Sequence, residues 1–256
     1  MTALLRHLWA FAPAFAVLAL CPVAALLSAD AQGPGLEHAR TVADVERSLG
    51  LYVEPDLVGW AGGRETLLWV AGAIYLGVHV PAIGGALVLV YLHRRAAFAR
   101  VQAVFVVCQL ALVACWVAWP LAPPHQLTGG APSLGRPWDT GASAAAGVLQ
   151  SSYAAMPSGH VAFALLAAWT LGHLALPRVV RRAAWLYPAL VAAITLITAN
   201  HFWLDVVAAA LLVSAAMGAV RTAAAVSASG GGQRLKLAVG GQVLERPALE
   251  RPQARG

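Results

Sequence analysis

Two short stretches of the chain carry residue types that could do chemistry together. The stretch PSGH ends at His160 and directly precedes an apolar run. The stretch NHFWLD contains His201 and, four residues later, Asp205. Residues four apart lie on one face of a helix, so a helix beginning here would let the histidine and the carboxylate meet. Ionisable groups are costly to place in apolar segments, which makes both stretches candidates for a functional site.

These three residues form a complementary set for phosphoryl transfer. If Asp205 accepts the hydrogen on Nδ1 of His201, the opposite ring nitrogen is left unprotonated and nucleophilic. His160 can then give a proton to a leaving oxygen and later take one from an acceptor. The prediction is a phosphohistidine intermediate on His201, with His160 and Asp205 as the other catalytic residues.

The PSGH stretch also predicts an anion cradle at the start of a helix. A helix N-terminus offers free backbone N–H groups, to which Ser158 adds a hydroxyl and Gly159 adds room for a phosphate to approach. Asn200, the only asparagine in the chain, lies beside His201 and is a further candidate for phosphate contact. This chemistry needs no metal or other cofactor, and no carboxylate cluster in the sequence suggests a metal site.

A phosphoryl group should also meet a cation, because arginine suits phosphate oxygens well. The candidates are Arg136 in GRPWD, which is preferred, His125 in APPHQ, and Arg47. Each could instead be a solvated loop residue, and for Arg47 that is the favoured interpretation. His79 lies within an apolar run and is interpreted as a packed or helix-bonded core histidine.

The composition predicts an integral membrane protein. The 256 residues are 60% hydrophobic and 11% charged, with a mean hydropathy of +0.71. Soluble domains average about 45–50% apolar and about 25% charged residues. The net charge of +6 comes from short basic clusters between apolar runs, a pattern that indicates membrane topology and no nucleic-acid partner.

Six apolar segments are long enough, with their flanks, to cross a membrane, which takes roughly 20 residues. They are residues 7–28, 66–92, 98–121, 160–176, 183–200 and 203–225. The predicted fold is therefore all-α, a six-helix membrane bundle over residues 1–226, followed by a flexible cytoplasmic tail over residues 227–256. The first segment could instead be a cleaved signal peptide, but its length and its prolines favour a retained helix.

Arginines gather in alternate connections between these segments. One set of connections holds Arg6, Arg94, Arg95, Arg100, Arg178, Arg181, Arg182 and Arg221. The two long loops, 29–65 and 122–159, hold only four arginines between them. The positive-inside rule then places the arginine-rich set and both termini in the cytoplasm of a cell-membrane protein. His160 and His201, one helical hairpin apart, would lie together at the extracytoplasmic face.

The two long loops differ in pattern. Around Val42, Val45, Leu49 and Leu51 the apolar residues recur at helical spacing with acids between them, which predicts an interfacial amphipathic helix. The loop 122–159 is rich in glycine, proline and serine and is expected to have little regular structure.

The PSGH stretch combined with His-x-x-x-Asp resembles the type 2 phosphatidic acid phosphatase superfamily. The stretches NHFWLD and ERSLGLYVEP (residues 46–55) are more similar to its inositol phosphorylceramide synthase branch of inositolphosphotransferases. The resemblance covers roughly residues 40–215. It implies a six-helix bundle with an outward-facing site, where His201 is the nucleophile, His160 the acid and base, and Asp205 the orienting group.

The chain departs from that family in its cationic motifs. The Ser-Arg-x5 that precedes the second histidine in the broader family is replaced here by Ile194 and Thr195. The Lys-x6-Arg-Pro motif is missing as well. The stretch HRRAAFAR at 93–100 has a similar spacing, but the predicted topology puts it on the cytoplasmic side.

The favoured function is a membrane phosphatase or phosphotransferase that acts on a lipid-linked phosphate. Water as the acceptor makes it a phosphatase, and an alcohol such as inositol or a sugar makes it a transferase. Two other classes stay open: a non-catalytic transport or assembly protein that uses the histidines as proton carriers, and metal or haem binding by His160 and His201. The sequence indicates no particular oligomeric state.

The arginine asymmetry leads to a test of topology. A reporter fused within residues 122–159 is expected to be active outside the cytoplasm, and one fused after residue 230 inside it, because basic flanks are retained in the cytoplasm. Paired alkaline phosphatase and fluorescent-protein fusions measure this. The reverse pattern would falsify both the sidedness and the exclusion of Arg94, Arg95 and Arg100 from the site.

Overall fold

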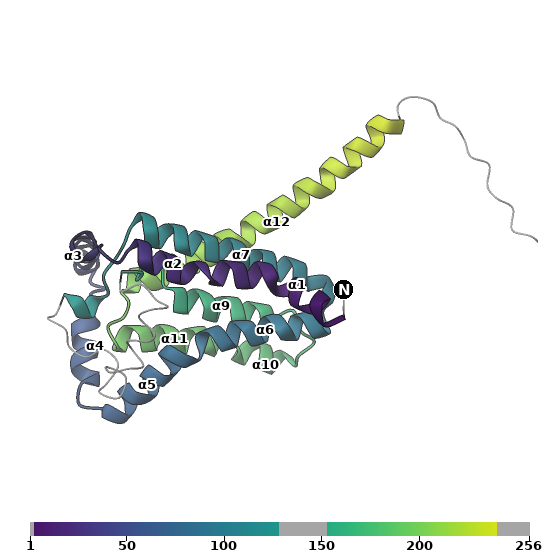
Figure 1. Ribbon diagram of the computed structural model, residues 1–256. Helices are drawn as coiled ribbons and strands as arrows, with labels where there is room; N and C mark the ends of the chain where they lie inside the picture. Colours follow the sequence, from purple (N-terminus) through teal and green to yellow (C-terminus); the bar gives the residue numbers. More distant parts are fainter. Residues whose placement is uncertain (1–2, 128–152, 240–256) are drawn as a thin grey trace, which may run out of the picture. The chain divides into compact units, whose positions relative to one another are not determined.

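The computed structural model describes residues 3–127 and 153–239, and this part of the chain is helical, with no strand and one isolated β-bridge (Figure 1). Its helices are α1 (Ala3–Leu18), α2 (Leu20–Leu27), α3 (Gln32–Ser48), α4 (Glu54–Ala61), α5 (Glu65–Gly77), α6 (His79–His93), α7 (Arg95–Ala118), the 3-10 helix η1 (Pro124–Gln126), α9 (Gly159–Leu171), α10 (Arg178–Ala183), α11 (Leu186–Ile197) and α12 (Trp203–Val239). Residues 1–217 form one compact unit, which holds the candidate site, and residues 218–256 form a second.

The all-helical membrane class is confirmed, whereas the count of six spanning helices is not. Four helical stretches are long and apolar enough to cross a membrane: His7–Leu27, Arg95–Ala118, Arg178–Ile197 and Trp203–Ser227. The bent pair α5 and α6 makes a fifth if it is one span. The segment predicted at 160–176 is helical only over Gly159–Leu171. Its 13 residues rise about 20 Å, less than the roughly 30 Å of a hydrocarbon core.

The segment predicted as a single helix over 66–92 is broken in the structure. Helices α5 and α6 meet at Val78 with a bend of 48° (Figure 1). Pro81, in the first turn of α6, lacks an N–H, and its ring clashes with the carbonyl of residue 77 in a continuous helix. The side chain of His79 donates from Nδ1 to the carbonyl oxygen of Tyr75 at 3.0 Å, across the break. The bend thus turns Tyr75 and His79 toward the neighbouring helix α9.

Helix α9 is the buried centre of the first unit. Nearly every residue from His160 to Ala168 is buried, and the helix packs on α6, α11 and α7. A helix that is apolar all round is stable only when neighbours cover it on every side. The first turn of α9, which carries the PSGH stretch, is therefore held inside the helical unit.

A helix, α3, spans Gln32–Ser48 where an interfacial amphipathic helix is predicted, but it ends before Leu49 and Leu51, and its place at a membrane surface stays a prediction. Val42 is buried, whereas Val45 and the following Leu49 and Leu51 are exposed. On its buried side α3 joins a hydrophobic cluster made of Ala39, Val42, Ala43, Leu121, Ala122, Ala155 and Phe202. This cluster contains residues adjacent to both chemical stretches.

Backbone hydrogen bonds tie the segments of this cluster to one another. The N–H of Leu121 donates to the carbonyl oxygen of Tyr153 at 2.7 Å, and the N–H of Ala155 donates back to Leu121 at 3.2 Å. The N–H of Ala122 donates to the carbonyl of Gly35 in α3 at 3.0 Å. The chain leading into PSGH is thereby fixed to α3 and to the end of α7.

Helix α12 begins at Trp203 and continues to Val239. Residues 227–239, which the composition assigns to the tail, therefore continue the helix. The division of the chain at residue 227 and the flexibility of the tail stay predictions.

Gly35 has no room for a side chain, because a Cβ there would lie 2.8 Å from Cδ1 of Tyr153. Gly35→Ala should therefore lower the free energy of unfolding by about 1–3 kcal/mol through overpacking. Thermal unfolding of the purified protein in detergent measures this. Gly33→Ala is the matched control in the same helix, since its Cβ meets nothing within 4 Å. Equal unfolding midpoints for the two variants would contradict the close packing of α3.

Candidate active site

The turn between α11 and α12 places His201. The N–H groups of Asn200 and His201 both donate to the carbonyl oxygen of Thr195, at 3.0 and 3.2 Å, which closes the end of α11. Ala199 has a φ of 48°, in the left-handed region that residues with a side chain rarely adopt. This sharp reversal buries His201 just before α12 begins at Trp203.

The ring of His201 is held in one tautomer. Its Nδ1 lies 2.8 Å from the carbonyl oxygen of Ala155 and 3.2 Å from Oδ2 of Asp205. A carbonyl oxygen can only accept, so Nδ1 carries the hydrogen, and in the neutral ring Nε2 presents its lone pair. Within the described residues Nε2 is buried and has no hydrogen-bond partner. The predicted pairing of His201 with Asp205 is thus present, and Ala155 supplies a second acceptor that the sequence did not indicate.

Asp205 has a second contact that fixes its position. Its Oδ2 also accepts the N–H of Phe202 at 2.9 Å, as a carboxylate does at the start of a helix. Its Oδ1 is buried without a partner among the described residues. The carboxylate therefore serves both the first turn of α12 and the ring of His201.

His160 lies beside His201, as the hairpin separation predicts. The two ring centroids are 5.8 Å apart in an edge-on arrangement. The ring of Tyr75 stacks on His160 at 3.8 Å, and the ring of His79 lies 4.2 Å from it. In the described part of the chain, Nε2 of His160 is buried and unpartnered.

Sequence reasoning missed the role of the α5–α6 break in building this site. His79 is helix-bonded, as interpreted, but it also contacts His160. Its position within an apolar run was a usable signal, because ionisable residues there usually have a specific partner. Tyr75 gave no signal, since an aromatic residue in an apolar helix is ordinary core.

The PSGH stretch caps α9 and joins it to the other motif. The Oγ of Ser158 accepts the N–H of Val161 at 3.3 Å. The backbone N–H of Ser158 donates to the backbone carbonyl oxygen of Asp205 at 3.1 Å. The first N–H groups of α9, at Gly159 and His160, have no carbonyl one turn earlier within the helix. The elements of the predicted anion cradle are therefore adjacent to both histidines.

Gly159 has a steric role that the sequence did not reveal. A Cβ at this position would lie 3.0 Å from Cζ2 of Trp116, and the indole Nε1 of Trp116 donates to the carbonyl of Pro157 at 3.0 Å. The small residue thus lets Trp116 pack beneath the turn. The close approach of a phosphate to Gly159 stays a prediction.

The other candidates for phosphate contact lie in different places. His125 lies in η1, where its N–H and its Nδ1 both donate to the carbonyl of Ala199, two residues before His201. The amide of Asn200 donates to Oγ1 of Thr198 at 2.8 Å. Arg47 is exposed, pairs with Asp44 at 2.6 Å and covers the ring of Tyr52. Arg136 lies outside the described residues.

The basic cluster at 93–100 is remote from the histidines. Nε of Arg94 donates to the carbonyl of His173, which follows the C-terminal end of α9, whereas His160 lies at the N-terminal end. About 20 Å of helix separates the two ends. HRRAAFAR is thus too far from His160 and His201 to bind a phosphate at this site.

Two further acids lie behind the site and were not identified as functional from the sequence. Glu46 and Glu54, the first and ninth residues of ERSLGLYVEP, are buried, and each accepts a backbone N–H from the first turn of α12. Among the described residues, no group of three or more histidine, cysteine or acidic residues is arranged to hold a metal ion. Both acids thus contact the helix that carries Asp205.

Comparison with known proteins identifies the family. No curated protein and no solved structure matches the chain. The family model described as the PAP2 superfamily matches residues 40–219, which is 180 of the 256 residues (219 − 40 + 1). The matched region includes the second half of α3, the turn before α9 and the turn before α12, and therefore every residue that holds the two histidines. On this match the chain belongs to the PAP2 superfamily.

Proposed function

We propose that the protein transfers the phosphoryl group of a lipid-linked phosphate through a phosphohistidine on His201. Members of the PAP2 superfamily are generally phosphatases or phosphotransferases, which supports this class of reaction. The observation that carries the proposal is the state of the His201 ring. Its Nδ1 is committed to Ala155 and Asp205, while its Nε2 presents a lone pair beside His160.

In the first step Nε2 of His201 attacks phosphorus, and the bond from phosphorus to the lipid oxygen breaks. Protonated His160 gives its proton to that leaving oxygen. In the second step His160 takes a proton from the acceptor, whose oxygen attacks phosphorus while the bond to Nε2 breaks. The positive charge on the phosphorylated ring lies against the carboxylate of Asp205, which stabilises it.

The identity of the phosphoryl acceptor decides between two activities. Water gives a phosphatase, and an alcohol such as inositol or a sugar gives a phosphotransferase. The resemblance of NHFWLD and ERSLGLYVEP to the inositol phosphorylceramide synthase branch favours transfer. The same histidine chemistry serves both acceptors, so the choice is an experimental one.

The site is proposed to face away from the cytoplasm. The arginine-rich connections, which the positive-inside rule places in the cytoplasm, include Arg94 at the end of α9 opposite His160. A site on the outer face would act on phosphates carried by lipids of the outer leaflet.

The direct assay is release of inorganic phosphate from a panel of lipid phosphates, with and without an added alcohol and with and without EDTA. We expect turnover that EDTA does not reduce, because the proposed nucleophile, the acid and base, and the orienting group are all side chains of the protein. Loss of activity in EDTA that returns with a divalent cation would contradict the metal-independent mechanism.

The two histidines are expected to respond differently to substitution. His201→Ala should abolish turnover and the acid-labile phosphoenzyme, because the nucleophile is gone. His160→Ala should slow substrates with poor leaving groups more than those with good ones, since a good leaving group needs little protonation. Turnover of alkyl and nitrophenyl phosphates measures this. Equal losses for both substrates would count against the acid role of His160.

Asp205→Asn tests how the nucleophile is oriented. An amide keeps the shape and can still accept the N–H of Phe202, but it carries no charge and can turn the His201 ring to the wrong tautomer. Activity should fall by at least about 10²-fold while the unfolding temperature stays near that of the wild type; the same substitution in a serine protease triad costs about 10⁴-fold. Ser214→Ala, further along α12, is the control. Activity retained in Asp205→Asn would leave the aspartate as a helix cap only.

A further inference from the structure

Two buried carboxyl groups from distant segments reach the first turn of α12. Oε1 of Glu46, near the end of α3, accepts the N–H of Leu204 at 2.7 Å. Oε1 of Glu54, the first residue of α4, accepts the N–H of Trp203 at 3.3 Å. Both side chains are almost wholly buried, with exposed fractions of 0% and 1%.

These contacts complete an unusual helix start. The first N–H groups of a helix have no partner within it. Here three successive N–H groups, those of Phe202, Trp203 and Leu204, are each taken by a different carboxyl group, from Asp205, Glu54 and Glu46 respectively. Two of the three acids lie about 150 residues earlier in the chain, so the start of α12 is fixed to α3 and α4.

Three ionised carboxylates in one buried place would repel each other strongly. The Oε2 atoms of Glu46 and Glu54 are both buried, and within the described residues neither has a hydrogen-bond partner. Burial and the charge of the nearby Glu54 raise the pKa of Glu46, against the lowering effect of the Leu204 N–H, to about 8. Burial also raises the pKa of Glu54.

We propose that Glu46 and Glu54 share one proton and together hold the first turn of α12, so that they are positioning residues for Asp205 and His201. A single shared proton leaves the pair with one negative charge. Both Oε1 atoms stay available to the backbone. The catalytic importance of this pair rests on the proposed phosphoryl transfer, whereas its hold on α12 does not.

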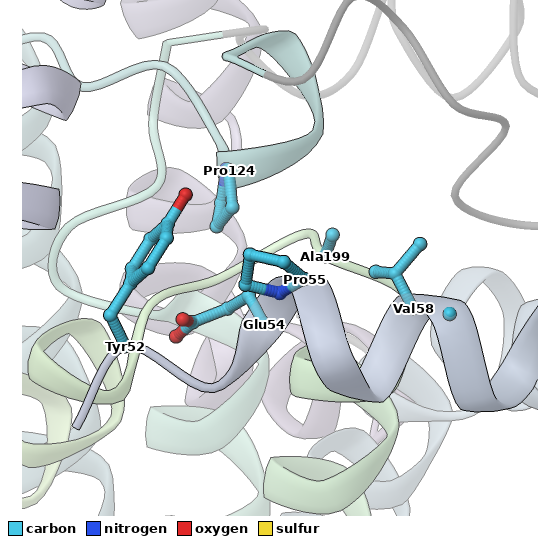
Figure 2. A pocket seen from close by; sticks show the side chains of 7 residues that line it. Tyr52, Glu54, Pro55, Val58, Pro124 and Ala199 are labelled. Carbon is cyan, nitrogen blue, oxygen red and sulfur yellow. The ribbon is translucent and has the colours of Figure 1, made fainter. Parts of the chain in front are cut away.

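A cavity of about 270 Å³ lies beside Glu54 (Figure 2). Its lining includes Tyr52, Glu54, Pro124 and Ala199. A water molecule occupies about 30 Å³ of liquid, so the cavity has room for several beside Glu54.

Few other ionisable groups face this pair. Asp205 lies on α12, Tyr52 on the segment between α3 and α4, and His125 in η1, which packs on α3. Helix α11, which packs on α4, carries no charged residue. Arg64 and Glu65, at the far end of α4, are exposed. His201, which contacts Asp205, also lies at the start of α12, so the contribution of the acid pair to a pH response of α12 is the part that Glu46→Gln and Glu54→Gln remove.

The first test uses the full-length protein in detergent and follows the structure of α12 directly. Glu46→Ala should speed deuterium exchange in the peptide containing Trp203 and Leu204 by at least tenfold, because the capping acceptor is lost. Glu46→Gln should restore most of the protection, since an amide oxygen also accepts an N–H. Glu37→Gln, an exposed acid on the same helix α3, is the control and should change nothing. Unchanged exchange in Glu46→Ala would overturn the proposal.

The second test follows the shared proton. A pKa of Glu46 raised from the ordinary value of 4.5 to about 8 means that the bound proton stabilises the fold fully below pH 4.5, and that this contribution is lost as the pH rises to 8. The unfolding midpoint of the wild type should fall between pH 5 and 8, and this slope should flatten in Glu46→Gln and Glu54→Gln. The control Glu37→Gln should keep the wild-type slope. An undiminished slope in both pair variants would refute proton sharing.

Turnover separates this proposal from the proposed activity. With an active wild type, Glu46→Ala should reduce kcat at least tenfold with little change in KM, and Glu46→Gln should recover most of it. Full kcat in Glu46→Ala would reject the positioning role. A wild type that shows the expected exchange and pH slope but processes no lipid phosphate would support the pair's hold on α12 and reject phosphoryl transfer.

Discussion

The hydrogen on Nδ1 of His201 is the constraint on which the site depends. Because the Ala155 carbonyl can only accept, it fixes that hydrogen on Nδ1 and leaves Nε2 as the basic nitrogen. Asp205 then adds a charge that favours a cationic ring without having to set the tautomer alone. This arrangement requires the chain before PSGH, the end of α11 and the start of α12 to meet within hydrogen-bond distance. Much of the surrounding structure holds these three segments at that distance.

Helix packing brings these three segments together. The buried helix α9 starts beside the end of α11, and the bend between α5 and α6 presses Tyr75 and His79 onto His160. The acids from α3 and α4 hold the start of α12 from behind. The nucleophile, its orienting carboxylate and the second histidine are thus each supported by a different part of the chain.

The parts of this site that could be predicted are those set by local spacing. A separation of four residues implies that His201 and Asp205 meet, and the hairpin of apolar segments brings His160 to the same end. The contacts of Glu46 and Glu54 could not be predicted, because they join residues 158 and 149 positions apart and depend on how α3 and α4 pack. A bend near Val78 could be predicted, because Pro81 disfavours a continuous helix. The direction of the bend depends on how α5 and α6 pack against α9. The shortness of α9 was missed because apolar composition continues past Leu171 after the helix has ended.

The loops around the site are joined largely by main-chain atoms. Leu121 pairs with Tyr153 and Ala155, Ala122 with Gly35, Ser158 with Asp205, and His125 with Ala199, in each case through a backbone N–H and carbonyl. Such bonds do not depend on the identity of the side chain. Relatives of this protein can therefore differ widely in these loops and keep the same active-site framework, provided that small residues stay where the chain is crowded. Divergence would then fall on the surfaces that meet the lipid and the acceptor, which lets one framework serve many substrates.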